Sequence, residues 1–447
     1  MTEPKKPNWR LETVAVHGGY RPDPTTRAVA VPIYQTVAYA FDDTQHGADL
    51  FDLKVPGNIY TRIMNPTTDV LEQRVAALEG GIAALALASG QSAVTYAILT
   101  IAEAGDNIIS SSTLYGGTYN LFAHTLPQYG ITTRFANPSD LAAFEAQIDD
   151  RTKAIFAESV GNPLGNITDI AALADVAHRH GLPLIVDNTV PSPYLLRPIE
   201  HGADIVVHSA TKFIGGHGTT LGGVVVEAGT FNWGNGKFPT MTEPVKSYGG
   251  IRWWDNFGEY GFLTKLRSEQ LRDIGPSLSP QSAFILLQGV ETLPQRMDAH
   301  VANARAVAEW LASDPRISFV TWSGLDEHPH FERAQKYFPL GPGSVFAFGV
   351  KPSGTFDSEE ARTEAARKTG EKLIESVQLA SHLANVGDAR TLILHPASTT
   401  HQQLSPEQLV AAGVPADLIR FSVGLEDPED IIWDLDQALT IATGESR

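Results

Sequence analysis

Two polar residues lie at the ends of β-branched, strand-like runs in the middle of the chain. Asp187 follows the apolar residues 182–186, and Lys212 follows a second apolar run, residues 203–208. Ligands of open α/β sheets bind beyond the carboxyl ends of the strands, so this carboxylate and this amine can meet at one site. There, a lysine amine can form a Schiff base with an aldehyde, and a carboxylate can keep a heterocyclic nitrogen protonated.

These are the two groups that pyridoxal 5'-phosphate (PLP) requires from a protein. The sequence therefore predicts a PLP enzyme in which Lys212 carries the cofactor and Asp187 contacts its pyridine nitrogen. The hydroxyl groups of Ser209 and Thr211, next to the lysine, are candidates for the cofactor phosphate. Taken singly, such a lysine can also be a surface or phosphate-contacting group, and a strand-end aspartate often caps the next turn.

Two further segments have residues that suit a phosphorylated aromatic cofactor. Ser89-Gly90-Gln91 follows the apolar run 83–88 and opens a predicted helix over 92–102, where free N–H groups and the helix dipole favour an anion. An ordinary strand-to-helix turn with a serine cap is the alternative. Tyr115 follows the next strand and is expected to stack on a planar ring, or else to be a half-buried core tyrosine.

Two arginines are candidates for binding anions. Tyr60 and Arg62 alternate along an extended N-terminal segment, so their side chains can point together toward a phosphate, or form a solvated turn. Arg420 lies in an apolar strand-like run, where a buried guanidinium needs an anionic partner. A substrate α-carboxylate or an internal acidic residue would serve. His328 and His330 lack a metal-ligand constellation and are interpreted as surface residues.

Composition narrows the class of protein. The chain has 447 residues with 43% hydrophobic content, which allows two domains and a large core, and a formal net charge of −18. We expect no nucleic-acid partner, because no basic stripe is present. The chain has no cysteine, which excludes disulfides and thiolate chemistry. It shows neither a signal peptide nor an apolar run long enough for a membrane span, so we expect a cytoplasmic protein.

Strand and helix patterns alternate up to about residue 225, which predicts an α/β fold with a mostly parallel, doubly wound sheet. A helix is expected over 67–79, capped by Thr67 or Thr68, and another over 168–180. The expected strands cover residues 82–87, 107–110, 154–157, 184–186, 205–208 and 223–226.

The chain is expected to have three parts. Residues 1–66 form an N-terminal arm that lies on another surface. Residues 67–284 form the large cofactor-binding domain, with an irregular insertion at about 228–275. Residues 285–447 form a smaller α+β C-terminal domain, with a helix at 297–312 and strands at 345–350 and 390–394.

Three rival functions explain the residues less well. Ser209-x-x-Lys212 with Lys368-Thr369-Gly370 fits a serine acyl-enzyme hydrolase, but no Ser-Asp-Asn box lies between them and Lys368 falls in a helix pattern, where a strand is required. A nicotinamide dehydrogenase would need a G-x-G-x-x-G turn between strand and helix. A non-catalytic binding protein leaves the lysine–aspartate pair unexplained.

With these residues in place, the chain resembles the γ-family of fold-type I PLP-dependent enzymes of cysteine and methionine metabolism. The resemblance extends over nearly the whole chain. Its motifs are Tyr60-Thr61-Arg62 with Met64-Asn65-Pro66-Thr67, Ser89-Gly90, Tyr115-Gly116, Val186-Asp187-Asn188-Thr189, Ser209-Ala210-Thr211-Lys212-Phe213, His395-Pro396-Ala397-Ser398-Thr399-Thr400-His401, and Ser422-Val423-Gly424.

The resemblance implies a role for each matching residue. Lys212 would be the Schiff-base lysine, Asp187 the partner of the ring nitrogen, and Tyr115 the stacking residue. The phosphate would be bound by a second group of residues, and the substrate by a third. The phosphate group comprises Ser89, Gly90, Gln91, Ser209 and Thr211, with Tyr60 and Arg62 reaching in from a neighbouring subunit; Asn162 would lie near the cofactor, and Arg420, Asn385 and Tyr60 would contact the substrate. Shared sites of this kind imply a dimer within a homotetramer.

Within the family, three features resemble O-acetylhomoserine sulfhydrylases. These are Asn385, where the lyases commonly have serine, an extended loop at 228–260, and Gly117, where methionine γ-lyases have cysteine. The implied reaction is γ-replacement in methionine biosynthesis. Lys212 would move protons as the general base, acetate would leave Cγ of O-acetylhomoserine, and sulfide or methanethiol would add there. Cystathionine γ-synthase and methionine γ-lyase activities are the alternatives within the family.

Overall fold

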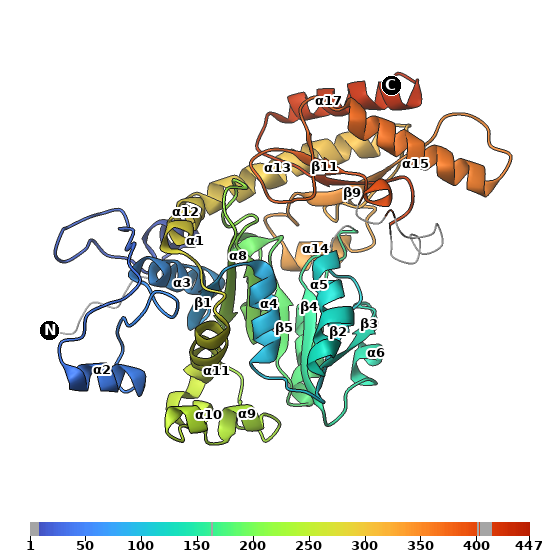
Figure 1. The fold of residues 1–447 in the computed structure, drawn as a ribbon. Helices are drawn as coiled ribbons and strands as arrows, with labels where there is room; N and C mark the ends of the chain where they lie inside the picture. The colour runs from blue at the N-terminus through green and yellow to red at the C-terminus, as the bar shows by residue number, and fades with distance from the viewer. Residues whose placement is uncertain (1–8, 162–163, 400–401, 403–413) are drawn as a thin grey trace. The chain divides into compact units, whose positions relative to one another are not determined.

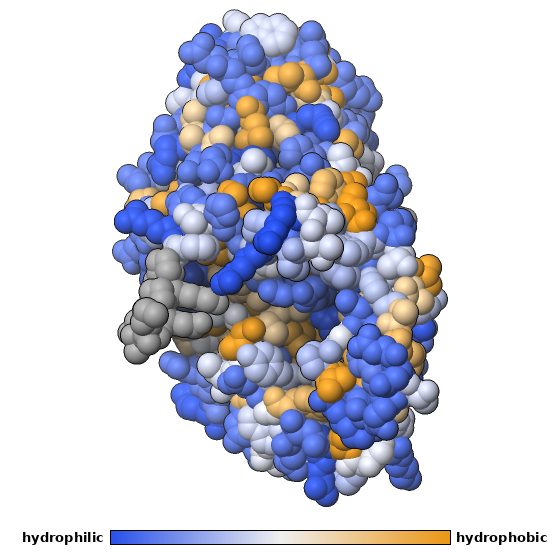
Figure 2. Space-filling view, turned by 90° about the vertical axis from the view of Figure 1, so that its left-hand side faces the viewer, coloured by the Kyte–Doolittle hydropathy of each residue, from blue (hydrophilic) through white to orange (hydrophobic). Residues whose placement is uncertain are grey.

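A computed structural model describes residues 9–161, 164–399, 402 and 414–447. The chain divides into two compact units, each built from more than one segment. Unit 1 comprises Met1–Ser159, Asp169–Gly215 and Thr219–Pro294, and unit 2 comprises Val160–Thr168, Gly216–Gly218 and Gln295–Arg447. On the face drawn in Figure 2, hydrophilic residues predominate and hydrophobic residues form smaller patches among them.

The described residues of unit 1 form a seven-stranded sheet in the order β1-β7-β6-β5-β4-β2-β3 (Figure 1). Only β7 runs antiparallel to its neighbours, β1 and β6, so the other six strands point the same way. The prediction of a mostly parallel sheet is therefore confirmed. The strands are β1 (Ala83–Leu87), β2 (Asn107–Ser111), β3 (Thr132–Ala136), β4 (Thr152–Glu158), β5 (Leu184–Asp187), β6 (Ile205–Ser209) and β7 (Gly223–Glu227).

The central strands are buried on both faces, as a parallel sheet between two helix layers requires. Every residue of β2, β4 and β7 is buried, and in β5 and β6 only the last residue is partly exposed. Those two last residues are Asp187 and Ser209. The apolar runs seen in the sequence thus end where the strands meet solvent.

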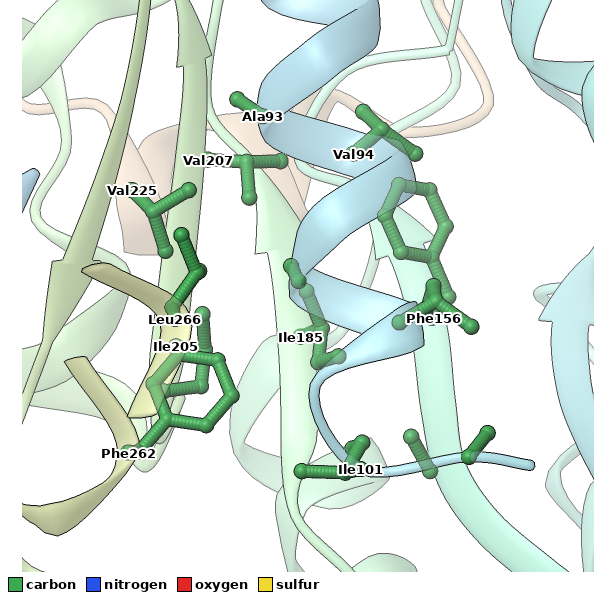
Figure 3. Close-up of a cluster of buried hydrophobic side chains, with 14 of the residues drawn as sticks. Ala93, Val94, Ile101, Phe156, Ile185, Ile205, Val207, Val225, Phe262 and Leu266 are labelled. Atoms are coloured by element: carbon green, nitrogen blue, oxygen red, sulfur yellow. The ribbon is translucent and has the colours of Figure 1, made fainter. Parts of the chain in front are cut away.

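Helices cover the two faces as the strand order demands. The chain runs from β1 at one edge through β2 to β3 at the other edge and then back through β4, β5 and β6. Right-handed crossovers therefore place α4 (Gly90–Leu99) and α7 (Ile170–Arg179) on opposite faces of the sheet. On the first face α4 packs with Phe262 and Leu266 over side chains of β4 to β7, including Phe156, Ile185 and Val207 (Figure 3).

The helical segments of unit 1 outside the stretch 228–275 are mostly short. They are α1 (Leu11–His17), α2 (Thr44–Phe51), α3 (Pro66–Glu79), α4 (Gly90–Leu99), α5 (Gly116–Asn120), η1 (Leu121–Thr125), η2 (Leu126–Tyr129), α6 (Leu141–Glu145), α7 (Ile170–Arg179), α8 (Ser192–Leu195), η3 (Pro198–His201) and α12 (Pro280–Glu291).

The predicted cap of the first regular helix is wrong. The N-cap of α3 is Asn65, whose side-chain oxygen accepts the N–H of Thr67 at 2.9 Å. The hydroxyl of Thr67 instead bonds to the arm, where it donates to Pro32 O at 2.8 Å and accepts the N–H of Tyr34 at 2.9 Å. This buried threonine therefore fastens the N-terminal arm to α3.

The stretch 228–275 is built of short helices, which its glycine- and tryptophan-rich sequence did not indicate. Aromatic packing holds them: the rings of Trp233 and Phe262 stack with centroids 5.2 Å apart, and Trp253 is fully buried in the same cluster. The segments are α9 (Pro239–Thr242), η4 (Lys246–Tyr248), α10 (Trp253–Phe257), η5 (Gly258–Tyr260), α11 (Gly261–Lys265) and η6 (Leu266–Ile274).

The described residues of unit 2 form a five-stranded sheet in the order β10-β11-β12-β9-β8, antiparallel except for the β10–β11 pair. A separate apolar core, which includes Phe346, Phe421 and Leu435, joins this sheet to its helices. The elements are α13 (Leu293–Ala312), β8 (Ile317–Val320), α14 (Phe331–Tyr337), β9 (Val345–Val350), α15 (Glu359–Ser376), β10 (Ser381–His382), β11 (Leu392–Leu394), η7 (Pro396–Ser398), β12 (Leu418–Ser422) and α17 (Pro428–Thr443).

The fold also argues against the serine acyl-enzyme hydrolase considered above. Lys368 lies within α15, and the third box of that motif needs a strand. The helical pattern predicted for this stretch is confirmed.

Glu227, the last residue of β7, ties the 228–275 stretch to the sheet. Its two carboxyl oxygens accept the indole N–H of Trp233 at 3.4 Å and the backbone N–H of Leu263 at 3.1 Å. Burial raises the pKa of Glu227 from its usual 4.5 to about 8. Between pH 4.5 and about 8, Glu227 therefore keeps a proton in the folded protein that it releases in the unfolded chain. The stability given by neutral Glu227 is lost as the pH rises through this range.

We predict that Glu227→Gln destabilises the protein at pH 6, because the amide NH₂ group must face one of the two N–H donors. The gap in melting temperature between wild type and variant should narrow by about 2 °C or more at pH 8.5, since only wild type has lost stability. Thermal unfolding at both pH values measures this gap. A gap that is the same at both, with exposed Glu332→Gln as the control, would show that Glu227 ionises normally.

Candidate active site

The carboxyl ends of five strands carry the polar residues of the candidate site. Strands β1, β2, β4, β5 and β6 point the same way, so their ends lie along one edge of the sheet. The residues at or just after these ends are Ser89 (β1), Tyr115 (β2), Glu158 (β4), Asp187 (β5), and Ser209 and Lys212 (β6). The predicted convergence at a sheet edge is the arrangement that the topology produces.

Asp187 is held in place by the residue two positions later. Its Oδ1 accepts the backbone N–H of Thr189 at 2.9 Å and the hydroxyl of Thr189 at 2.5 Å. Burial raises the pKa of Asp187, while these two hydrogen bonds and the nearby His208 favour the charged form. The carboxylate therefore has a fixed orientation.

Thr189 also connects Asp187 with the neighbouring strand. Its hydroxyl oxygen accepts the backbone N–H of Ser209 at 2.8 Å while its hydrogen goes to Asp187. One hydroxyl thus sets the distance between the nitrogen partner proposed for the cofactor and the turn that leads to Lys212.

Lys212 leaves β6 through a tight turn, in which its backbone N–H donates to Ser209 O at 3.1 Å. The residue is half-buried. Thr211, between them, uses its hydroxyl on the backbone: it donates to Gly222 O at 3.2 Å and accepts Gly222 N–H at 3.0 Å. A phosphate contact from Thr211 therefore requires its hydrogen to leave Gly222, and this role stays a prediction.

The N-terminus of α4 lies against Ser209. A Cβ atom added at Gly90 would be 2.5 Å from Cβ and 2.8 Å from Oγ of Ser209, so only glycine permits this approach. Ser89 caps α4, its Oγ accepting the N–H of Ser92 at 3.1 Å. The first free N–H groups of α4 and the Ser209 hydroxyl are thereby brought into one small region, which suits a phosphate.

Tyr115 presents an exposed ring from a fixed backbone. Its N–H donates to Oε1 of Glu158 at 2.6 Å, whereas the residue itself is 52% exposed. A Cβ atom added at Gly117 would be 2.5 Å from Cε1 of Tyr115 and 2.6 Å from Nε2 of Gln91. The tyrosine ring and the Gln91 amide therefore lie together over Gly117, and the exposed ring is accessible for stacking.

Tyr60 and Arg62 lie on the arm and are exposed. The guanidinium carbon of Arg62 is 5.4 Å from the centroid of the Tyr60 ring, so the two side chains do project together. Backbone pairing between Ala38 and Tyr60 holds this extended segment. Their predicted contact with a neighbouring subunit's phosphate site is not tested by a single chain.

In unit 2, two predicted substrate-binding residues lie together. Nη2 of Arg420, on β12, donates to the backbone oxygen of Asn385 at 3.1 Å. This contact orients the guanidinium group. Asn162, the remaining predicted cofactor residue, lies outside the described residues.

Sequence reasoning missed Glu158 and Thr189. Glu158 ends an apolar strand just as Asp187 does, and this signal was present, because the run over 154–157 leads directly into the glutamate. Thr189 was named only as part of the Val186–Thr189 motif and was given no role, since its importance arises from contact with another strand. His328 and His330 are half-buried rather than fully at the surface, and burial lowers the pKa of His328 to about 4.

Within residues 9–161, 164–399, 402 and 414–447, no group of three or more histidine, cysteine, aspartate or glutamate residues is placed to bind a metal ion. In the same part of the chain, no helix combines the length and the apolar character that crossing a membrane requires.

The donor set fits PLP. An oriented, half-buried carboxylate suits a pyridinium nitrogen, and a helix that opens with glycine beside the Ser209 hydroxyl suits a phosphate. The Lys212 amine follows in the turn after the strand that ends at Ser209. This combination at the edge of a mostly parallel sheet is typical of PLP-dependent enzymes.

Comparison with known proteins agrees. A family model described as "Cys/Met metabolism PLP-dependent enzyme" matches residues 12–440, and the chain belongs to this family. It is 51% identical over 441 residues to the O-acetyl-L-homoserine sulfhydrylase of Leptospira meyeri, covering 97% of each chain. It is 46% identical over 441 residues to the homocysteine/cysteine synthase of Saccharomyces cerevisiae, covering 97% of this chain and 99% of that protein.

A solved structure is also similar. It is a putative O-acetylhomoserine (thiol)-lyase from Campylobacter jejuni containing N'-pyridoxyl-lysine-5'-monophosphate, with a TM-score of 0.91 and 40% sequence identity. The alignment covers 96% of this chain and all of that one. The predicted fold class, the family and the PLP cofactor are thereby confirmed.

We predict that Thr189→Val weakens cofactor binding while Thr189→Ser retains most of it. Valine keeps the shape but removes the hydroxyl, which leaves the Ser209 N–H without its acceptor and Asp187 with one hydrogen bond fewer. A hydrogen bond to a charged group contributes about 1.5–3 kcal/mol, so the Kd for PLP should rise at least about tenfold. Titration of the apo-protein with PLP measures this, and equal affinity in the valine variant would refute the link.

Proposed function

We propose that the enzyme replaces the acetate of O-acetyl-L-homoserine by sulfide, forming L-homocysteine in methionine biosynthesis. Methanethiol, which would give methionine, is the second acceptor in this proposal. The observation that carries it is the similarity to relatives named for this substrate, which extends over at least 96% of this chain at 50–51% identity. Because the aligned region spans both units, it covers both groups of candidate residues.

PLP, when bound, supplies an electron sink for charge that develops at the substrate's Cα. The protein's part in this proposal falls to three residues of unit 1. The Asp187 carboxylate keeps the ring nitrogen protonated, the exposed Tyr115 ring stacks on the cofactor, and the Lys212 amine removes and returns protons at Cα and beyond. The hydrogen bonds from Thr189 and to Glu158 fix the first two in place.

Binding of the anionic groups is assigned to the other candidates. The N–H groups of α4 at Gly90 and Gln91, with the hydroxyls of Ser89, Ser209 and Thr211, are proposed for the cofactor phosphate. Arg420, oriented by Asn385, is proposed for the substrate's α-carboxylate, where a planar guanidinium can form two parallel hydrogen bonds. Asn162 keeps its proposed place near the cofactor.

We further propose a homotetramer, made of dimers in which Tyr60 and Arg62 complete the partner's phosphate site, in the cytoplasm. The arm supports self-association, because it exposes large apolar side chains that a lone chain leaves in water. They are Val29, Ile33, Val37, Phe41, Phe51 and Val55.

Product analysis tests the reaction. With O-acetyl-L-homoserine, homocysteine should form with sulfide, and Lys212→Ala should lower kcat at least about a hundredfold because the base is lost. Cystathionine formed from added cysteine would indicate a cystathionine synthase instead. A keto acid formed without any thiol would indicate a lyase.

The assembly has its own test. Val37→Glu introduces a charge at a position that is 61% exposed in the single chain, and should convert the oligomer to smaller species and weaken cofactor binding. Leu340→Glu, at an exposed position of unit 2, is the matched control. Light scattering after size-exclusion chromatography measures the mass, and an unchanged mass for Val37→Glu would contradict the proposed role of the arm.

A further inference from the structure

Glu158 contacts Tyr115 and pairs with Asp187, two of the proposed cofactor residues, and its protonation state has no role in the reaction as written above. It is the last residue of β4 and pairs in register with Asp187, the last residue of β5. Its Oε1 accepts the backbone N–H of Tyr115 at 2.6 Å. The residue is only 7% exposed. Glu158 therefore lies between the residue proposed to stack on the cofactor and the residue proposed to contact its nitrogen.

Two neighbouring carboxyl groups, one buried and one half-buried, resist being charged at the same time. Burial raises the pKa of Glu158 well above its usual range, and the charge of Asp187 raises it further, opposed by the N–H of Tyr115. The pKa of Asp187 is also raised by burial, but Thr189 and His208 oppose this rise. These contacts favour the negative charge on Asp187 and the proton on Glu158.

The other charged groups around the pair lie on the adjoining elements. His208, on β6, is fully buried with its Nε2 3.5 Å from Oε2 of Glu79, on α3. The same glutamate accepts a hydrogen bond from Asn188 at 3.2 Å, next in sequence to Asp187. Lys212 follows β6 at the same sheet edge. The region holds three acidic residues, so one neutral carboxyl reduces their mutual repulsion.

We propose that Glu158 is a positioning residue that acts as a neutral carboxyl, holding the Tyr115 backbone and leaving the negative charge of the pair on Asp187. The inference rests on the PLP roles proposed above for Tyr115 and Asp187. A neutral Glu158 can accept from Tyr115 and also donate toward Asp187, whereas an ionised Glu158 can only accept.

Three substitutions at this position separate the neutral role from a charged one. Glu158→Gln keeps length and neutrality and can still accept from Tyr115. Glu158→Asp keeps the carboxyl group but is one methylene too short to reach that N–H. Glu158→Ala removes both functions. PLP affinity is measured by titration of each apo-protein, and the visible absorption of the bound cofactor is followed against pH.

We expect Glu158→Gln to have the smallest effect, with a Kd within about threefold of wild type and an absorption midpoint moved by less than about 0.3 pH units. For Glu158→Asp and Glu158→Ala we expect the Kd to rise about tenfold, the result of one buried N–H left without an acceptor. If Glu158→Ala does not fold, the comparison of Glu158→Gln with Glu158→Asp still shows whether a neutral group at this position is sufficient.

The reverse order, with aspartate close to wild type and glutamine weak, would overturn the inference, since it would show that a charge is required. Equal affinities in all variants would overturn it as well. A wild-type protein that binds no PLP would instead refute the proposed function, so the two failures are distinguishable.

Discussion

Parallel pairing of β4, β5 and β6 is the constraint on which the candidate site depends. In-register parallel strands end at the same level, so Glu158 and Asp187 emerge side by side, and the pairing of Asp187 with Val207 places Ser209 and Lys212 just beyond. The antiparallel β7 then brings Gly223 opposite Ser209, which closes this edge of the sheet. Strand register thus brings these residues to the same edge of the sheet.

The same pairing concentrates ionisable groups where water is scarce. Burying a carboxylate is costly unless it is hydrogen-bonded or neutral, and this site contains carboxyl groups of both kinds. Asp187 receives two hydrogen bonds from Thr189, and Glu79, which faces His208, accepts a hydrogen bond from Asn188. A site in which one carboxylate is charged and its neighbour is not has the electrostatics that an adjacent protonated ring nitrogen requires.

Much of this could be predicted from the sequence, because strand ends are visible as the points where apolar runs stop. That signal indicated Asp187, Ser209 and Lys212, and the glycine of the α4 turn indicated the region proposed for the phosphate. Contacts between strands were not visible: Thr189 holds Ser209 only because β5 and β6 are neighbours, and Asn65 replaces the predicted threonine cap because Thr67 binds the arm. The short helices of 228–275 depend on aromatic packing rather than on helix propensity, which local patterns cannot show.

The central claim is that Lys212, beside Asp187, carries the cofactor. Reduction of the PLP-loaded protein with borohydride fixes the cofactor covalently to its lysine, and peptide mass mapping then identifies that residue. We predict a single modified peptide, the one that contains Lys212. Modification of another lysine, or of none, would contradict the assignment of the site.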